Sequence, residues 1–337
     1  MSLLPTRLAL AVAATLLSLL GVAAMASADL RIPTLGEATT LSQIPESVSW
    51  GSATASDGNE TFVAFSESEA GILFQRIGAA GTEFSSQLKL QMPGTASIGA
   101  PAIATSGDRV YVAWLQAAYG MNEDHVVLAA SHDGGRTFST PVLAGRPTGH
   151  GAWDLSIDAD GENVFVAWSD DRDRLWTAGS RDAGRTFPCQ AVITAPGMPT
   201  MAGSYDIAVD GPRVHWVWLG DDFDAYTRRS VDGGRRIGTV QHLRSGSPSD
   251  FIGSPNIDAD GGVVAITTSQ EYRMPRPDHT GTDFGHQPVL TTSQDGGDTW
   301  AEQNIGTPAD RCIGDYCSAP YGLDVDGLDV YVGWRGR

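Results

Sequence analysis

The sequence is poor in basic residues and has no helical pattern after its N-terminal segment. It holds 22 Lys and Arg against 40 Asp and Glu, a formal net charge of −18. This balance argues against a nucleic-acid partner, because proteins that bind nucleic acids neutralise phosphates with Lys and Arg. No amphipathic stretch with helical spacing stands out, and neither a Gly-x-Ser-x-Gly elbow nor a P-loop is present. These absences exclude the commonest nucleotide-binding and serine-hydrolase motifs.

Cysteine is scarce, with three residues in 337. They fit an oxidising compartment. Cys312 and Cys317 lie close enough in the sequence to close a small loop, so we expect a disulfide between them, with Cys189 left over.

The first 28 residues differ from the rest of the chain. Arg7 precedes an almost wholly apolar run over 8–26, and small residues follow at 26–28. This pattern predicts a secretory signal peptide cleaved after Ala28, and the alternative is an uncleaved membrane anchor. We therefore expect a mature chain of 29–337 that is secreted or periplasmic and leaves the membrane on cleavage.

The remaining sequence is built from repeats. One pattern recurs at intervals of 49, 50 and 63 residues, and a degenerate copy precedes it at 77–84. The four copies are "SHDGGRTF" (131–138), "SRDAGRTF" (180–187), "SVDGGRRI" (230–237) and "SQDGGDTW" (293–300). A period near fifty residues is typical of propeller blades.

A second, apolar pattern runs in step with the first. Its six copies are "ETFVAFSE" (60–67), "RVYVAWLQ" (109–116), "NVFVAWSD" (163–170), "RVHWVWLG" (213–220), "GVVAITTS" (262–269) and "DVYVGWRG" (329–336). Their β-branched and aromatic composition favours strands buried on both faces. Most copies follow an Asp-Gly type turn, which suits a tight hairpin. Each unit therefore reads as four antiparallel strands, which make one blade.

Six copies predict an all-β, six-bladed β-propeller of four-stranded antiparallel blades. The sixth unit stops just after its second strand. The last blade is then incomplete, or residues 29–46 supply a closing strand from the N-terminus, or the sequence is a fragment of a longer chain. The sequence leaves these alternatives open.

The repeated pattern S-x-D-x-G-x-T-[FW] resembles the Asp-box, or BNR repeat, of the sialidase-like propellers. Three copies match it in full, through Asp133, Asp182 and Asp295, and the copy with Asp232 departs from it at its last two positions. The resemblance implies a structural role for these aspartates, at the turn between the third and fourth strands and away from the catalytic face. The residues agree, because a carboxylate can accept hydrogen bonds from backbone N–H groups of its own turn.

Function is then expected at the opposite mouth of the ring, on loops that follow the second strands or lead into the next blade. Long polar loops on a regular scaffold often carry function. The longest, 269–287, accounts for the stretched spacing of 63 residues. The others are 115–125, 145–154, 169–176, 219–226, 245–251 and 307–321.

The resemblance implies an exo-α-sialidase-like glycosidase, with arginines that clamp a substrate carboxylate, a tyrosine nucleophile paired with a glutamate, and an aspartate as acid/base. The candidates for the catalytic groups are Glu271, Tyr272, Tyr316 and Asp170. The candidates for the substrate clamp are Arg172, Arg273, Arg276 and Arg311. The chain departs from the family in the position of its "RIP" at 31–33, which lies too far before the first strand pair.

The alternative function is a non-catalytic propeller that binds a glycan or an extracellular protein. We expect no cofactor and no metal site, with the carboxylates of "DDRD" (170–173) and "DDFD" (221–224) as candidate Ca²⁺ ligands. The Asp-rich segments 158–162, 258–262 and 324–329 are in phase with the strands and are interpreted as hairpin turns. The expected partner is a glycan, a glycoconjugate or an extracellular protein, and the expected state is a monomer.

Overall fold

The computed structural model describes residues 51–67, 71–79, 81–92, 95–118, 124–145, 151–194, 197, 200–244, 255–275, 282–305, 312–313 and 320–334. All of its named elements are β-strands. Within these residues, no helix is long and apolar enough to cross a membrane. The predicted signal peptide and residues 29–46 lie outside the described residues.

The strands form separate antiparallel sheets that follow the chain order. Sheet 1 contains β1 (Ser52–Ser56), β2 (Glu60–Glu67), β3 (Gly71–Gly78) and β4 (Leu88–Leu90). Sheet 2 contains β5 (Thr95–Ser106), β6 (Arg109–Ala118), β7 (Asp124–Ser131) and β8 (Val142–Gly145). Sheet 3 contains β9 (Ala152–Asp160), β10 (Asn163–Asp170), β11 (Leu175–Ser180) and β12 (Cys189–Val192).

The second half of the chain continues the pattern. Sheet 4 contains β13 (Met201–Asp210), β14 (Arg213–Gly220), β15 (Ala225–Ser230) and β16 (Gln241–Arg244). Sheet 5 contains β17 (Asn256–Asp260), β18 (Val263–Pro275), β19 (Thr282–Ser293) and β20 (Ala301–Asn304), with β21 (Cys312–Ile313) paired to β19. Sheet 6 contains β22 (Pro320–Asp326) and β23 (Asp329–Trp334). The predicted antiparallel four-stranded unit is confirmed.

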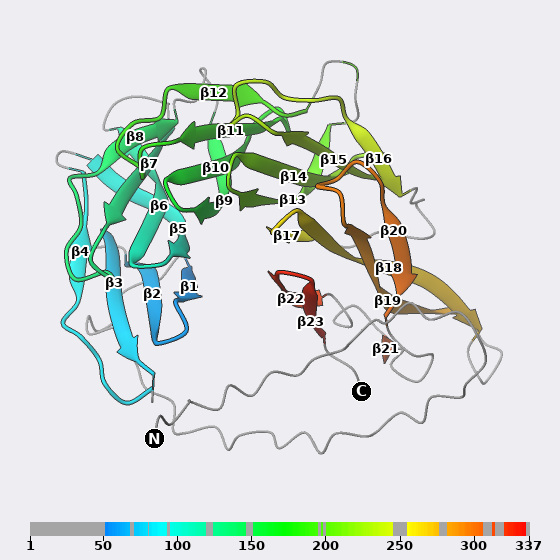
Figure 1. Ribbon diagram of the computed structural model, residues 1–337, viewed down its shortest axis with the longest axis horizontal. Helices are drawn as coiled ribbons and strands as arrows, with labels where there is room; N and C mark the ends of the chain where they lie inside the picture. The colour runs from blue at the N-terminus through cyan, green and yellow to red at the C-terminus, as the bar shows by residue number, and fades with distance from the viewer. Residues whose placement is uncertain are drawn as a thin grey trace.

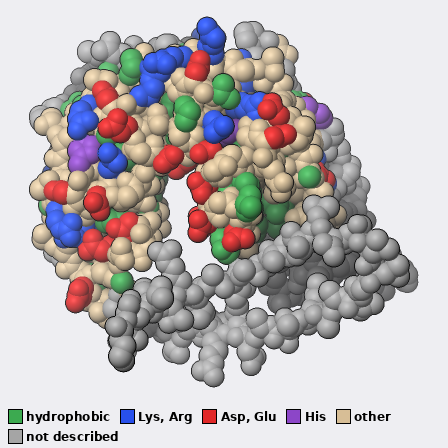
Figure 2. Space-filling view, in the orientation of Figure 1, with side chains coloured by type: hydrophobic (Ala, Val, Ile, Leu, Met, Phe, Trp, Pro, Cys, Tyr) green, Lys and Arg blue, Asp and Glu red, His purple; other side chains and the backbone are tan. Residues whose placement is uncertain are grey.

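The sheets follow one another around a common centre (Figure 1). Strands β1, β5, β9, β13, β17 and β22 are innermost, and each lies beside the next. Asp and Glu side chains surround the central opening, while many Lys and Arg side chains lie farther out (Figure 2).

The Asp-Gly segments form the tight hairpins that the sequence predicts. Asp160 pairs with Asn163 across Gly161, which has a φ of 60°. Asp210 and Arg213 pair in the same way across Gly211, with a φ of 55°. Glycine adopts this left-handed conformation at little cost, so these positions favour it.

The hydrophobic core lies between neighbouring sheets. The largest fully buried side chains lie mainly on second strands, and they include Trp114 of β6, Trp168 of β10, and Trp216 and Trp218 of β14. Phe165 of β10 packs edge-to-face on Trp216 of β14, which links sheets 3 and 4. Removing such side chains from water is the main favourable contribution to folding.

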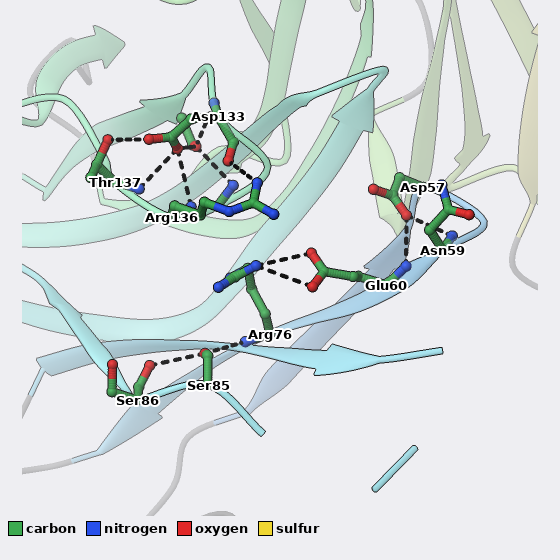
Figure 3. A network of polar contacts seen from close by, with 11 residues as sticks. Asp57, Asn59, Glu60, Arg76, Ser85, Ser86, Asp133, Arg136 and Thr137 are labelled. Carbon is green, nitrogen blue, oxygen red and sulfur yellow. Dashed lines mark hydrogen bonds and ion pairs between the residues drawn. The ribbon is translucent and has the colours of Figure 1, made fainter. Parts of the chain in front are cut away.

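The four repeated turns join the third and fourth strands, as expected. Asp133 shows how they are held (Figure 3): its Oδ1 accepts the backbone N–H groups of Arg136 and Thr137 at 3.0 and 2.9 Å, and its Oδ2 accepts the Thr137 hydroxyl at 2.6 Å. The hydroxyl and backbone hydrogen bonds from Thr137 lower the pKa of Asp133 to about 2. Asp182 and Asp295 have the same threonine partner, but Asp232 lacks it because Arg236 stands there.

The glycine of each repeated turn faces the preceding sheet. At Gly234, with a φ of 76°, an added Cβ would lie 2.8 Å from Cε1 of Phe165. Gly184 similarly faces Leu128 and Tyr111 of sheet 2. The repeated turns therefore hold their own shape and also close the contact between consecutive sheets.

One prediction about the fold is wrong. The 269–287 segment was expected to be a long loop, but most of it extends the hairpin of β18 and β19. Their register runs from Val264 opposite Ser293 to Pro275 opposite Thr282. The backbone hydrogen bonds of the sheet continue through the insertion, so the longer spacing is a longer pair of strands.

Candidate functional site

Aspartates of the inner strands connect sheet 3 to sheet 4, sheet 4 to sheet 5 and sheet 5 to sheet 6. The carboxylate of Asp158 on β9 accepts the backbone N–H of Val209 on β13 at 2.6 Å. In the same way, Asp206 accepts the N–H of Ile257 at 3.1 Å, and Asp258 accepts that of Val325 at 2.7 Å. We call these three aspartates the inner-strand latches. A further row at the hairpin ends, Asp160, Asp210 and Asp260, accepts the N–H groups of Gly211, Gly262 and Gly327.

Burial makes the latches harder to ionise than ordinary aspartates. It raises the pKa of Asp158 to about 7 and that of Asp206 to about 6, and it also raises the pKa of Asp258. Neighbouring latches add to this effect, because each negative charge disfavours another one nearby. Each latch therefore makes a structural hydrogen bond, and burial brings the pKa of Asp158 and Asp206 close to neutral pH.

The other end of the inner strands forms the mouth, and β9 is irregular there. Ser156 pairs with Ala167 but Trp153 pairs with Ser169, so β9 contains one extra residue. Asp154, inside this bulge, has a φ of 45°, and Trp153 beside it is 60% exposed. A non-glycine residue in this conformation is strained, and bulges redirect side chains near functional sites.

Tyr205 on β13 faces the bulge. Its hydroxyl is buried, and no hydrogen bond of good geometry joins it to a described residue, although Ser169 lies close enough to affect its pKa. Burial raises the pKa of Tyr205, and the charge of Asp154 raises it further. Its neighbour Asp206 accepts the Ser156 hydroxyl at 2.8 Å. The fold thus brings Asp154 of β9 near Tyr205 of β13, and it ties Asp206, the next residue, to Ser156 of β9.

Sequence reasoning included 145–154 among the mouth loops but singled out none of these side chains. The signal available was an aromatic-acidic pair, Trp153-Asp154 in one repeat and Tyr205-Asp206 in the next. The two pairs lie at different distances from their hairpin turns, and in the strand pairing Asp206 corresponds to Ser156 rather than to Asp154.

Asp170, a predicted acid/base, ends β10 and is buried. Its Oδ1 accepts the N–H groups of Arg172 and Arg174, both at 3.0 Å, and its Oδ2 accepts the Trp176 indole N–H at 2.8 Å. Arg174 also forms an ion pair with it at 2.6 Å. These hydrogen bonds lower the pKa of Asp170 although burial opposes them. Its described contacts hold the 170–174 turn together, and its catalytic role stays a prediction.

The remaining predicted residues are placed only in part. Arg172 is exposed at the mouth end of β10. Glu271, Tyr272 and Arg273 lie on the extended part of β18, opposite His286, Gly285 and Phe284. Cys312 pairs with His286 through β21, so the two segments singled out for function lie side by side in one sheet. Three predicted site residues and the second cysteine of the predicted bridge lie outside the described residues: Arg276, Arg311, Tyr316 and Cys317.

The described residues offer one further, weaker candidate. No group of three or more acidic, His or Cys side chains is arranged to hold a metal ion in the described part of the chain. A polar hollow of about 350 Å³ lies between the hairpin turns of sheets 1 and 2, lined by Asp57, Asn59 and Asp108 among others. Oδ1 of Asp57 accepts the N–H groups of Asn59 and Glu60, both at 2.7 Å (Figure 3). The hollow thus lies at the hairpin-turn end of the sheets, where Asp57 is already hydrogen-bonded within its own turn.

No family model and no curated protein matches the sequence. Among solved structures, the chain is similar to the NanB sialidase of Streptococcus pneumoniae, with a TM-score of 0.46, 9% identity and coverage of 76% of this chain and 61% of the sialidase. It therefore spans less than two thirds of that enzyme. The α-L-arabinanase of Penicillium chrysogenum gives a TM-score of 0.43 at 13% identity, covering 75% and 80% of the two chains. The GH93 α-L-arabinofuranosidase of Fusarium graminearum gives 0.44 at 16%, covering 76% and 81%. Likenesses of this strength assign no activity to the chain.

Proposed function

We propose that the chain is a six-bladed, sialidase-like β-propeller that binds a glycan at the mouth of β9 and β13 and hydrolyses a glycosidic bond there. The sheets around one centre and the four Asp-box-like turns support the propeller. The observation that carries the function is the approach of Asp154, in the bulge at the start of β9, to Tyr205 of β13, whose neighbour Asp206 is bonded to β9 through Ser156. The proposal includes export of the chain by its N-terminal segment.

The chemistry requires two acidic groups in different environments. Glycoside hydrolysis uses a carboxylic acid with a raised pKa to protonate the leaving oxygen, and usually a second carboxylate to activate water or attack the sugar. The pKa of Asp206, raised to about 6 by burial, suits the acid. Asp154 is exposed and lies close enough to Tyr205 for its charge to act on it, and it is the candidate for the second carboxylate.

Tyr205 has a different role in this proposal. A tyrosine nucleophile would need its phenol activated, but burial and the charge of Asp154 raise the pKa of Tyr205 and keep it protonated. It is then a hydrogen-bond donor to the substrate. A sialidase-type reaction would instead draw its clamp and nucleophile from Tyr272, Arg273 and the residues after Pro275, whose side chains lie outside the described ones.

The second candidate is a propeller that binds a glycan without hydrolysing it. The three hydrogen bonds that Asp206 accepts, from Ser156, Ile207 and Ile257, favour this alternative because they fit a fixed structural carboxylate. In that case Asp154 and Tyr205 would bind the ligand and no bond would break.

Hydrolysis of chromogenic sialosides, arabinosides and xylosides by the purified mature chain tests the proposal. Asp154→Asn and Asp206→Asn should each lower kcat at least about 100-fold, as expected for loss of acid/base catalysis. Tyr205→Phe should mainly raise KM. The control is Asp160→Asn, which changes a carboxylate at the hairpin end and should keep activity. Full activity in both mouth variants would contradict the proposed site, and glycan binding without turnover would favour the second candidate.

A further inference from the structure

We infer that the mouth takes a neutral sugar, whose apolar face stacks on Trp153 and whose hydroxyl groups donate to Asp154. The inference rests on the proposed glycan function and adds the class of sugar to it. It is carried by the charge of the inner strands, the exposure of one tryptophan and the backbone that fixes its position.

The inner strands contain acidic side chains and no basic ones. Together β1, β5, β9, β13, β17 and β22 contain nine aspartates and no Lys, Arg or His. The aspartates are Asp154, Asp158, Asp160, Asp206, Asp210, Asp258, Asp260, Asp324 and Asp326. Among these aspartates, Asp154 is exposed in the bulge at the mouth, and a sugar carboxylate beside it would meet like charge, which disfavours binding. A neutral sugar is not repelled by the Asp154 carboxylate, and its hydroxyl groups can donate hydrogen bonds to it.

Trp153 is unusual among the large apolar side chains of the described residues. It is 60% exposed, whereas Trp114, Trp168, Trp216 and Trp218 are fully buried. A side chain of this size gains free energy when a ligand covers it, since apolar area leaves water. The negative face of an indole ring also attracts the polarised C–H groups that form one face of a pyranose or furanose.

The backbone holds Trp153 in place before any ligand arrives. Its carbonyl oxygen accepts the Ser169 hydroxyl at 2.9 Å, which ties it to β10. The next residue, Asp154, has its strained φ of 45° inside the bulge. The stacking ring and the proposed acceptor are consecutive residues of one bulge, and both side chains are exposed. Preorganisation of this kind reduces the entropy lost on binding.

Binding and hydrolysis assays with Trp153 variants test the inference. The probes are xylotriose, arabinotriose and cellotriose as neutral oligosaccharides, and 3′-sialyllactose as the anionic one, each titrated calorimetrically at pH 7. The native protein should bind at least one neutral probe more tightly than sialyllactose. Trp153→Ala should weaken that binding at least about tenfold, and Trp153→Phe should restore most of it because the ring face remains. The matched control is Leu328→Ala, which removes an 83% exposed apolar side chain in the hairpin turn of β22 and β23 and should bind like the native protein.

The outcomes separate this inference from the proposed function. Unchanged binding and KM for the neutral probe in Trp153→Ala, with hydrolysis retained, would overturn the inference and leave the glycosidase proposal standing. Tighter binding of sialyllactose than of every neutral probe would also overturn it. If the native protein neither binds nor hydrolyses any of these glycans, both proposals fail.

Discussion

The carboxylate of Asp158 on β9 lies 2.6 Å from the backbone nitrogen of Val209 on β13, so a side chain of one sheet completes the hydrogen bonding of the next. Its pKa is raised to about 7 by burial. The native state therefore binds a proton between about pH 4 and pH 7 that the unfolded chain has released. Stability from this group is present at low pH and is lost as the pH rises through 7.

Asp158→Asn should remove that dependence. The amide oxygen can still accept the Val209 N–H, but no proton is taken up. We expect the variant to lose less stability than the native protein between pH 5 and pH 8, as measured by urea unfolding at several pH values. Equal slopes for the two proteins would show that Asp158 titrates normally. The repeated turns do not interfere, because the pKa of Asp133 is about 2 and its contribution changes below pH 4.

His215 should make stability depend on pH in the opposite direction from Asp158. It occupies the position on β14 that holds Phe165 on β10, it is fully buried, and neither ring nitrogen has a hydrogen-bond partner among the described residues. Burial and the charges of Arg229 and Arg213 lower its pKa to about 4. The unfolded chain takes up a proton first, so stability is lost as the pH falls from 6.5 towards 4. His215→Phe should stabilise the protein by about 1 kcal/mol at pH 5, and a destabilised variant in thermal unfolding would contradict this account.

Gly161 and Gly234 have similar φ values but different surroundings. Alanine substitutions at the two positions therefore distinguish backbone strain from steric contact. Gly161 has no atom within 4 Å of an added Cβ, whereas Gly234 has Phe165 at 2.8 Å. Gly161→Ala should cost about 1 kcal/mol from strain alone. Gly234→Ala should cost about 1–3 kcal/mol more, because the ring must move. Equal losses in denaturant unfolding would mean that the contact between the sheets tolerates a methyl group.

Asp133 tests the structural interpretation of the repeated turns. Asp133→Ala removes the acceptor for two N–H groups and a threonine hydroxyl, and we expect a loss of about 1–3 kcal/mol. Activity per folded molecule should stay unchanged, since the turn lies at the far end of the strands from the mouth. Unchanged thermal stability with lost ligand binding would assign the turn to the site instead.

The extended hairpin of β18 and β19 can be shortened without disturbing its sheet. Replacing residues 273–284 by a short Gly-Ser turn leaves Tyr272 opposite Gly285 as the last pair. The variant should unfold cooperatively like the native protein. If Tyr272, Arg273 and their neighbours bind substrate, turnover should fall sharply, and full turnover would confine the site to β9 and β13.

The regular part of this fold could be read from the sequence because it depends on short-range signals. The Asp-Gly hairpins and the turns at Ser131, Ser180, Ser230 and Ser293 recur in phase, and the apolar strands follow them. The extension of β18 was missed because two prolines and several turn-forming residues in 275–283 mask the alternation. The site was missed for another reason. The bulge at Asp154 shifts its register by one residue, and the partner of Asp158 lies 51 residues further along the chain. Neither the bulge nor this contact is indicated by the residues next to it in the sequence.

Every latch joins a side chain to the backbone of the sheet that follows it, never to that of the sheet before. Sheets 4 and 5 thus each carry an acceptor for the sheet that follows and a donor for the sheet before. Because the donor is a main-chain N–H, it is present whatever the sequence of the copy that receives it. A gene segment coding for one unit could be duplicated in tandem and the new copy would fit its neighbours at once. Later divergence at the mouth would then leave the joints between copies intact.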